Sequence, residues 1–196
     1  LDGRSIHALF PPHSEIVVTT TTHSLVNQPA PDLVLPSGDG RFYNVRSGGS
    51  GATADEARLA APVERARVVY FYPKDDTPGC TTEACDFTSE LDEFNTLGAD
   101  VFGLSPDSVA SHAKFAKKHS LRIHLLADTE QIAASAFGVW REKSMYGRVY
   151  FGIVRTTFLI DRSGVVRQVW DDVKVRRKSG GSEIRHVDEV RAALQQ

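Results

Sequence analysis

The chain has 196 residues, and its 25 acidic and 23 basic side chains leave a formal net charge of -2 at pH 7. This length predicts one domain with a sizeable core, and the 41% hydrophobic and 24% charged residues are typical of globular proteins. The near-neutral balance argues against a nucleic acid or an anionic membrane as partner, and no apolar run reaches the roughly 20 residues of a bilayer span.

The N-terminal part of the chain predicts an extension followed by a hairpin. Residues 1–28 are interpreted as an N-terminal extension of a domain that covers residues 29–196, and the Thr-rich run 16–22 predicts one edge strand in that extension. Two short apolar runs flank the turn signal SGDG within residues 31–46. This pattern is typical of a β-hairpin.

The next segments change character several times. Residues 47–66 begin as a flexible Gly/Ser loop and then become Ala-rich until Pro62 interrupts any helix, so we interpret this segment as a surface insertion. The β-branched and aromatic run RVVYFYP at residues 67–73 predicts a buried central strand. Apolar residues then recur every three or four positions, which predicts a helix over about residues 80–97.

The second half of the chain alternates strands and helices. A buried strand is predicted at residues 99–106, a helix at 108–120, and a short strand followed by a helix within 124–140. Residues 155–173 show two β runs around DRSG, and residues 182–195 form an amphipathic helix pattern. The order predicts an α/β protein with a thioredoxin-like fold, in which helices flank a central mixed sheet with an N-terminal β-hairpin extension.

The chain has two cysteines, Cys80 and Cys85, which follow the proline-rich turn YPKDDTPG. They are too few for a disulfide scaffold, so redox chemistry is the alternative to coincidence. The attacking species is a thiolate, and a free cysteine titrates near ~8.5. If a helix starts near residues 77–80, Cys80 lies in its first turn, where free backbone N–H groups favour a negative charge.

The spacing of the two cysteines restricts how they can react. On an intact helix, positions i and i+5 have Cα atoms about 8.7 Å apart and point about 140° away from each other. A disulfide tolerates at most about 7 Å between Cα atoms. Cys80 and Cys85 therefore cannot bridge until the first helical turn unwinds, and the spacing favours a pair that alternates between two states.

Several blocks of this sequence resemble the peroxiredoxins. Pro73, Thr77 and Cys80 fit the pattern P-x-x-x-T-x-x-C, and YFYPKDDTPGCTTEAC is similar to the bacterioferritin comigratory protein (peroxiredoxin Q) subgroup. The resemblance continues through GLSPDSVASHAKFAKKHSL, EKSMYG and GIVRTTFLID, and it covers about residues 29–174. It implies an atypical 2-Cys thiol peroxidase without a cofactor or a metal.

The resemblance also implies a reaction cycle. Cys80 would attack a hydroperoxide and become a sulfenic acid, and Cys85 would resolve it by forming an intramolecular disulfide. Thioredoxin or a similar dithiol protein would restore the two thiols by exchange. An intrachain resolving residue removes the need for a dimer, so we expect a monomer, and we expect it in the cytoplasm.

Four further residues have roles by resemblance, and each has a plainer alternative. Thr77 would bind the thiolate and the peroxide, but it could act as a helix cap only. Arg155 would hold a positive charge near the sulfur, or pair with a carboxylate at the surface. Pro73 would shield the pocket. Glu83 would orient Arg155, or serve only as an acid that the helix dipole favours in the first turn.

Two other functions stay open at this point. A redox-sensing interaction protein could use the same disulfide to reshape a binding surface. A disulfide reductase usually has C-x-x-C, whereas four residues separate the cysteines here. The extension, the segment 47–66 and the chain after Lys174 have no counterpart in the resemblance, and the basic run 173–181 is interpreted as a solvated loop rather than a nuclear address or an anion patch.

Two groups of side chains are assigned no chemistry. His112 and His119 lie seven positions apart on one predicted helix, beside several lysines, and we expect both to be exposed to solvent. Trp140, Tyr146 and Phe151 are expected to pack in the core or the pocket wall.

Overall fold

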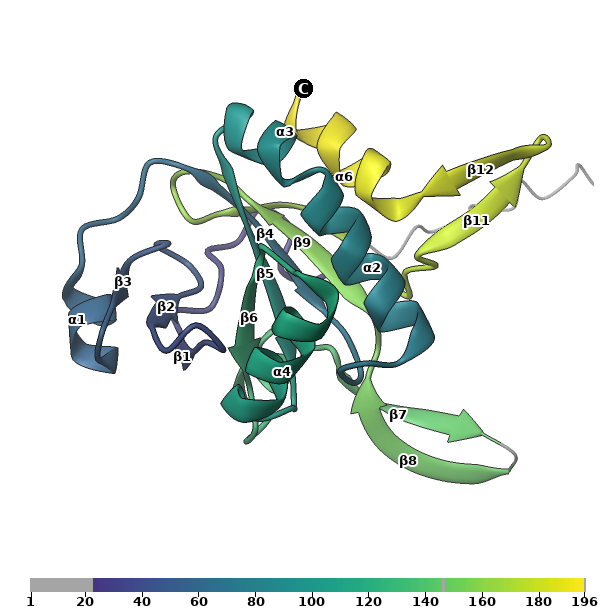
Figure 1. Ribbon diagram of the computed structural model, residues 1–196, viewed down its shortest axis with the longest axis horizontal. Helices are drawn as coiled ribbons and strands as arrows, with labels where there is room; N and C mark the ends of the chain where they lie inside the picture. Colours follow the sequence, from purple (N-terminus) through teal and green to yellow (C-terminus); the bar gives the residue numbers. More distant parts are fainter. Residues whose placement is uncertain (1–22, 146, 196) are drawn as a thin grey trace, which may run out of the picture.

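A five-stranded mixed sheet forms the centre of the molecule (Figure 1). In this computed structural model, which describes residues 23–145 and 147–195, the middle strand β4 (Ala66–Phe71) is buried at every position. It pairs in parallel with β5 (Ala99–Ser105) and antiparallel with β9 (Thr156–Ile160). β6 (His124–Ala127) and β10 (Val166–Trp170) complete the order β10-β9-β4-β5-β6, which confirms the predicted mixed sheet.

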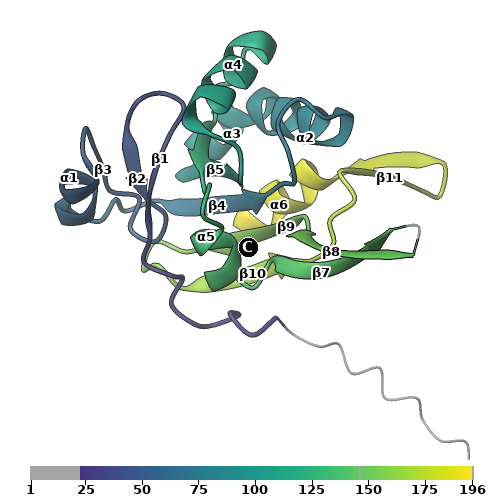
Figure 2. The same ribbon diagram turned by 90° about the horizontal axis from the view of Figure 1, so that it is seen from below.

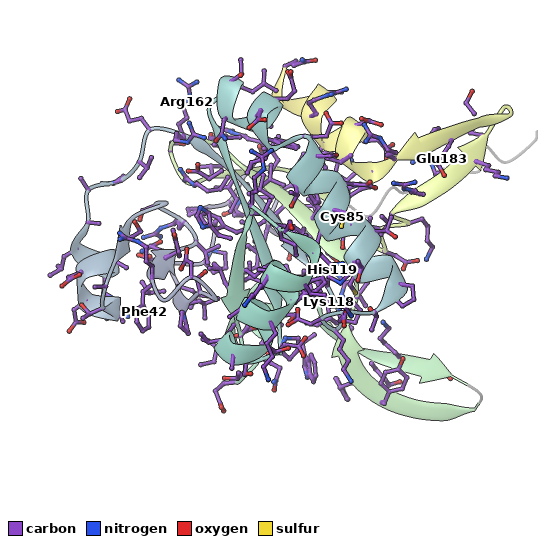
Figure 3. The ribbon with its side chains drawn as sticks, in the orientation of Figure 1. Phe42, Cys85, Lys118, His119, Arg162 and Glu183 are labelled. Carbon is purple, nitrogen blue, oxygen red and sulfur yellow. The ribbon has the colours of Figure 1, made fainter. Side chains whose placement is uncertain are left out.

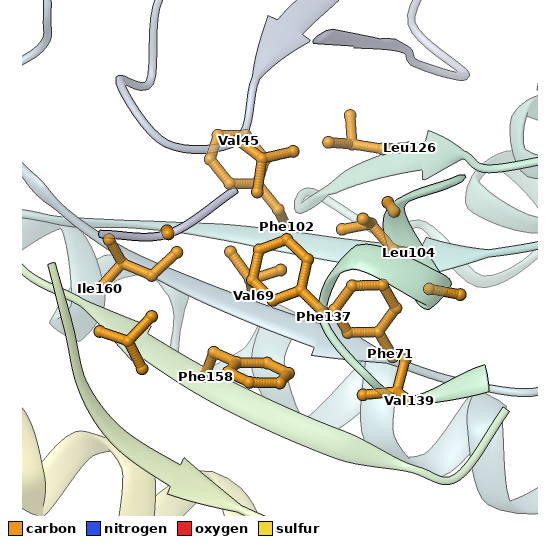
Figure 4. Close-up of a cluster of buried hydrophobic side chains, with 14 of the residues drawn as sticks. Val45, Val69, Phe71, Phe102, Leu104, Leu126, Phe137, Val139, Phe158 and Ile160 are labelled. Atoms are coloured by element: carbon orange, nitrogen blue, oxygen red, sulfur yellow. The ribbon is translucent and has the colours of Figure 1, made fainter. Parts of the chain in front are cut away.

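Alternate residues of β4 divide the core into two halves, because successive side chains of a strand point to opposite faces. Val69 and Phe71 pack with Phe137 and Phe158 on one face, as Figure 4 shows. Val68 and Tyr70 face the opposite cluster. Figure 2 shows helices on both sides of the sheet. The first face is covered by α5 (Ile132–Ala136), β1 (Val34–Pro36) and β2 (Phe42–Asn44), and the second by α2 (Pro78–Ser89), α3 (Leu91–Thr96), α4 (Val109–His119) and α6 (His186–Leu194).

The N-terminal hairpin is present, but the glycine-rich segment after it is not a flexible loop. β1 and β2 pair antiparallel as predicted, and β3 (Ser50–Gly51) continues this small sheet into α1 (Ala54–Leu59). A Cβ atom at Gly51 would lie 2.3 Å from Glu56 Cβ, and one at Gly49 would lie 2.9 Å from the Ala57 carbonyl oxygen. These glycines are therefore required for close packing against α1. The edge strand predicted at 16–22 lies outside the described residues.

The long helix predicted over residues 80–97 is two helices. Glu90 ends α2 and precedes α3, with φ -96° and ψ 4°, and its carboxylate binds arginines from the C-terminal part of the chain. The periodicity runs through the break because Phe87, Leu91 and Phe94 all pack against the same core cluster.

Two hairpins that the sequence patterns did not predict project from the body of the molecule (Figures 1 and 2). β7 (Trp140–Met145) pairs with β8 (Arg148–Ile153), and Phe151 on β8 is 59% exposed, so its predicted burial is wrong, whereas Trp140 packs against the core. β11 (Arg176–Ser179) pairs with β12 (Ser182–Arg185) in the region predicted as a basic loop and the start of the last helix. The turn between them is Gly-Gly with positive φ at both residues, a strong hairpin signal.

Candidate active site

Cys80 lies in the first turn of α2, directly after the loop that leaves the central strand. The helix begins with Pro78, which has no N–H to leave unpaired, and Thr77 is its N-cap residue. Cys80 is 2% exposed. Its sulfur is therefore shielded from bulk water at the end of a helix where backbone N–H groups favour an anion, which is the position that the helix-start pattern predicted.

Strand pairing brings Arg155 to this sulfur. β9 runs antiparallel to β4, with Thr156 opposite Phe71, so the residue before Thr156 lies beside the loop that precedes α2. The Arg155 guanidinium donates from Nη2 to Cys80 Sγ at 3.2 Å. Its Nη1 donates to the carboxylate of Glu83. Arg155 and Glu83 form a largely buried ion pair, with 15% of the Arg155 side chain and 1% of the Glu83 side chain exposed.

The electrostatics of this group depend on burial. Burial alone would lower the pKa of Arg155, but the charges of Glu83 and Cys80 outweigh that effect and raise it. Burial raises the pKa of Glu83 to about 7, against the opposing charge of Arg155. Among the described residues, Glu83 Oε1 and the buried Tyr70 hydroxyl have no hydrogen-bond partner. Only one oxygen of the Glu83 carboxylate, Oε2, thus has a partner among the described residues, and that partner is Arg155.

Thr77 and Pro73 lie next to this group without binding the sulfur in the described structure. The Thr77 hydroxyl donates to the Lys74 carbonyl at 3.1 Å, and the residue makes no side-chain cap bond. Pro73 is exposed in the loop between β4 and α2. The structure thus brings Cys80, Glu83 and Arg155 together, with Thr77 and Pro73 on the loop that leads to them.

A buried network behind this loop was missed in the sequence. Asp75 accepts hydrogen bonds from the Tyr72 hydroxyl and the Ser111 hydroxyl, each at 2.7 Å. His112 Nδ1 lies 2.9 Å from the same carboxylate, and its Nε2 lies 3.2 Å from the Leu126 carbonyl oxygen. Burial alone would raise the pKa of Asp75, but the hydrogen bonds and charge of His112 and the two hydroxyl donors lower it. The network fixes the loop to α4.

The expected exposure of His112 is wrong, because its side chain is 0% exposed. His112 shares the helix face of Phe115, which is three positions away and buried, so this apolar neighbour was the available signal. His119 is partly exposed and binds the next loop carboxylate, Asp76, at 2.7 Å. Lys118 also forms an ion pair with Asp76, and Figure 3 labels both α4 residues. Both loop acids are therefore held by α4.

Cys85 lies on the same continuous helix as Cys80, and both are free thiols. Cys85 is partly exposed, and burial together with the charge of the adjacent Asp86 raises its pKa. The intact helix keeps the two cysteines at the separation that excludes a disulfide in this state.

Comparisons with known proteins agree with this geometry. The sequence pattern of the AhpC/TSA family matches residues 26–169. Peroxiredoxin Bcp of Bacillus subtilis is 43% identical over 151 residues, which are 77% of this chain and 87% of the relative. The chain belongs to the AhpC/TSA family and is a peroxiredoxin.

Further relatives place this peroxiredoxin near one subgroup. Peroxiredoxin Bcp of Xanthomonas campestris is 46% identical over 127 residues, 65% of this chain and 74% of the relative. A solved structure of Xanthomonas campestris peroxiredoxin Q has a TM-score of 0.65 and 39% identity, and covers 83% of this chain and 89% of that chain. The resemblance to the Bcp and peroxiredoxin Q proteins and the thioredoxin-like fold are thereby confirmed, and the peroxiredoxin is a peroxidase.

The described residues contain neither a cluster of metal ligands nor a helix suited to a membrane. Among residues 23–145 and 147–195, no group of three His, Cys, Asp or Glu side chains is arranged to hold a metal ion. In the same part of the peroxiredoxin, no helix has the length and apolar character that a membrane crossing requires.

Proposed function

We propose that this peroxiredoxin reduces hydrogen peroxide and organic hydroperoxides with Cys80 as the nucleophile. The observation that carries the proposal is the hydrogen bond from Arg155 to the buried Cys80 sulfur at the start of α2. The thiolate attacks the distal peroxide oxygen, the O–O bond breaks, and the departing oxygen takes a proton to leave as water or alcohol. Arg155 stabilises the charge that moves onto this oxygen, while Glu83 holds the guanidinium in place.

The loop residues complete the proposed site. The Thr77 hydroxyl donates to the Lys74 carbonyl, and its lone pairs are free to accept a hydrogen bond from the O–H of the peroxide. Pro73, exposed at the rim of the same loop, shields the sulfur from water when a substrate is bound. The buried Asp75 network supports both residues by holding the loop on α4.

The second step is the closure of a disulfide. The Cys85 thiolate attacks the Cys80 sulfenic acid, the S–O bond breaks, and the leaving hydroxide takes a proton to become water. Because α2 is continuous through both cysteines, its first turns unwind before the sulfurs meet. Thioredoxin or a similar dithiol protein then reduces the disulfide in two exchange steps. Closure within one chain suits a monomeric enzyme.

A related protein supports the choice of substrate class. The structure of the Xanthomonas campestris bacterioferritin comigratory protein is described in terms of its alkyl peroxide reduction activity, and it covers 83% of this chain at 39% identity. On that basis, we include organic hydroperoxides among the proposed substrates of this enzyme.

The proposal is tested by pre-steady-state oxidation of three proteins: the parent, Cys80→Ser and Cys85→Ser. We expect Cys80→Ser to lose peroxide consumption, and Cys85→Ser to consume one equivalent at the parent rate without turnover by a thioredoxin system. Parent-rate consumption by Cys80→Ser would refute the assignment of the nucleophile. A parent that is oxidised once and is not recycled by any dithiol protein would instead favour a redox sensor.

A further inference from the structure

Three arginines from the C-terminal part of the chain hold the half of α2 that carries the second cysteine. Arg176 on β11 makes a bidentate interaction with the Asp86 carboxylate, in which Nη2 lies 2.6 Å from Oδ1 and Nε lies 3.2 Å from Oδ2. At the end of the helix, the Glu90 carboxylate binds Arg185 at 2.7 Å and also binds Arg191. The projecting hairpin and α6 therefore both fasten the same helix.

The pair between Arg176 and Asp86 stands next to the proposed resolving residue. Asp86 directly follows Cys85, and only 8% of its side chain is exposed. Among the described residues, no other side chain donates to its carboxylate. Glu183 on β12 lies 3.3 Å from the free nitrogen of the same guanidinium, so the hairpin itself orients Arg176. Figure 3 labels Cys85 on α2 and Glu183 on the hairpin that runs beside it.

We propose that Arg176 is a positioning residue that slows disulfide closure. By holding Asp86, it keeps the turn around Cys85 helical, and this turn has to open before the Cys85 sulfur can approach Cys80. The inference rests on the proposed function. A charge-assisted, two-point bond to a nearly buried carboxylate is the kind of contact that resists local unfolding.

Removal of Arg176 has a second effect that acts in the opposite direction. Burial and, secondly, the charge of Asp86 raise the pKa of Cys85, and the Arg176 guanidinium is the cation that offsets the Asp86 charge. Without Arg176, less Cys85 thiolate is present at neutral pH. The two effects separate in a pH–rate profile, because loosening of the turn changes the rate plateau of the fully ionised thiol, while the pKa change moves only the midpoint.

The experiment compares the parent protein with Arg176→Met, Asp86→Asn, the double variant and Arg177→Met. Arg177 is the matched control because it neighbours Arg176 on β11 but binds Glu189 on α6 and makes no hydrogen bond or ion pair to α2. Closure is followed by rapid quenching with an alkylating reagent and by mass spectrometry. We expect the plateau rate of closure to rise about two- to tenfold in Arg176→Met and in Asp86→Asn, and to stay at the parent value in Arg177→Met.

Two further readouts separate this role from a general loss of stability. The double variant should have the same plateau rate of closure as Asp86→Asn, because Arg176 acts through Asp86. Arg176→Lys should have a plateau rate between those of the parent and Arg176→Met. In the reduced proteins, amide hydrogen exchange over residues 84–89 should be faster in Arg176→Met than in the parent and in Arg177→Met. Unchanged exchange and an unchanged plateau in Arg176→Met would overturn the proposal.

The outcomes also distinguish this inference from the proposed function. If the parent forms no Cys80 sulfenic acid with peroxide, the peroxidase assignment fails, whereas the hydrogen-exchange comparison still decides whether Arg176 holds the turn. If Cys80 is oxidised at the same rate in all variants and closure also proceeds at one rate, the peroxidase assignment stands and the role of Arg176 is refuted.

Discussion

The Arg155 guanidinium lies 3.2 Å from the Cys80 sulfur, although 75 positions separate the two residues in the chain. The antiparallel pairing of β9 with β4 produces this proximity, since it places the start of β9 beside the end of the strand that leads into α2. The short link between strand and helix then leaves little freedom for the sulfur to move away.

Replacement of Arg155 by Met should slow the first oxidation of Cys80 by about 10²- to 10³-fold, because the transition state loses its donor and its positive charge. Arg155→Lys keeps the positive charge but loses the two-point contact, so its rate of Cys80 oxidation should lie between the rates of Arg155→Met and the parent. Stopped-flow measurement of thiol loss checks this. Arg122→Met, which removes an exposed guanidinium paired with Asp92, serves as the control. Equal rates for the Met variant and the parent would remove Arg155 from the reaction.

Disulfide closure should accelerate as the pH rises. Burial and the Asp86 charge raise the pKa of Cys85, so only a small fraction of this thiol is ionised at neutral pH. Because the thiolate attacks, the closure rate should increase about tenfold for each pH unit below that pKa. Asp86→Asn removes the adjacent charge and should shift the profile to lower pH. Quenched alkylation between neutral and alkaline pH measures both curves, and a closure rate independent of pH contradicts the expectation.

Glu83→Gln should change how stability depends on pH. The pKa of Glu83 in the folded protein, about 7, lies above its ordinary value of 4.5, so the folded state holds this proton more tightly than the unfolded state. Stability from this group is therefore present below pH 4.5 and lost as the pH rises to 7, by about 3 kcal/mol at most. Glu83→Gln has no carboxyl group to titrate, so its free energy of unfolding does not fall for this reason.

The measurement for Glu83 is a series of denaturant unfolding curves from acid to neutral pH. The useful quantity is the difference in free energy of unfolding between Glu83→Gln and the parent, since other titrating groups such as His186 contribute equally to both. This difference should grow in favour of Glu83→Gln as the pH rises from 4.5 to about 7. Two parallel curves would show that the carboxyl group does not take up a proton there.

His112→Leu should destabilise the protein by about 3–5 kcal/mol, because it leaves the Asp75 carboxylate buried without its imidazole hydrogen-bond partner. The additional change Asp75→Asn should restore part of this loss. Chemical denaturation gives the free energies, and amide exchange over residues 74–77 reports the loosening of the loop. His124→Leu, at a side chain that is 38% exposed, is the control and should change stability little. A similar loss in both histidine variants would argue against the buried pair.

Local patterns were sufficient to predict the strands of the central sheet and the position of Cys80. A continuous β-branched run identifies β4, and Pro78 after Thr77 marks the start of α2, because both depend on neighbours in the chain. The grouping of Cys80 with Arg155 came from the resemblance to a family, since no periodicity connects residues so far apart. Strand register, which only the structure supplies, is the physical cause of their contact.

The features that were missed depend on contacts between distant residues or on a weak local signal. His112 looked like part of an exposed basic helix until Asp75 was found 37 positions earlier in the chain, facing it in the core. The break at Glu90 is stabilised by arginines near the C-terminus, and the apolar periodicity continues across it. The β11–β12 hairpin did carry a local signal in its Gly-Gly turn, but the run of basic residues around it favoured a solvated loop.

The antiparallel neighbour of β4 also determines when the surroundings of Cys80 form during synthesis of the chain. The ribosome releases Cys80 first, and for the time taken to add the next 75 residues its sulfur lacks the Arg155 guanidinium. A nascent or truncated polypeptide that ends before β9 therefore carries a Cys80 thiol without this donor. Under the proposed function, we expect the reactivity of Cys80 toward peroxides to report that the sheet has assembled.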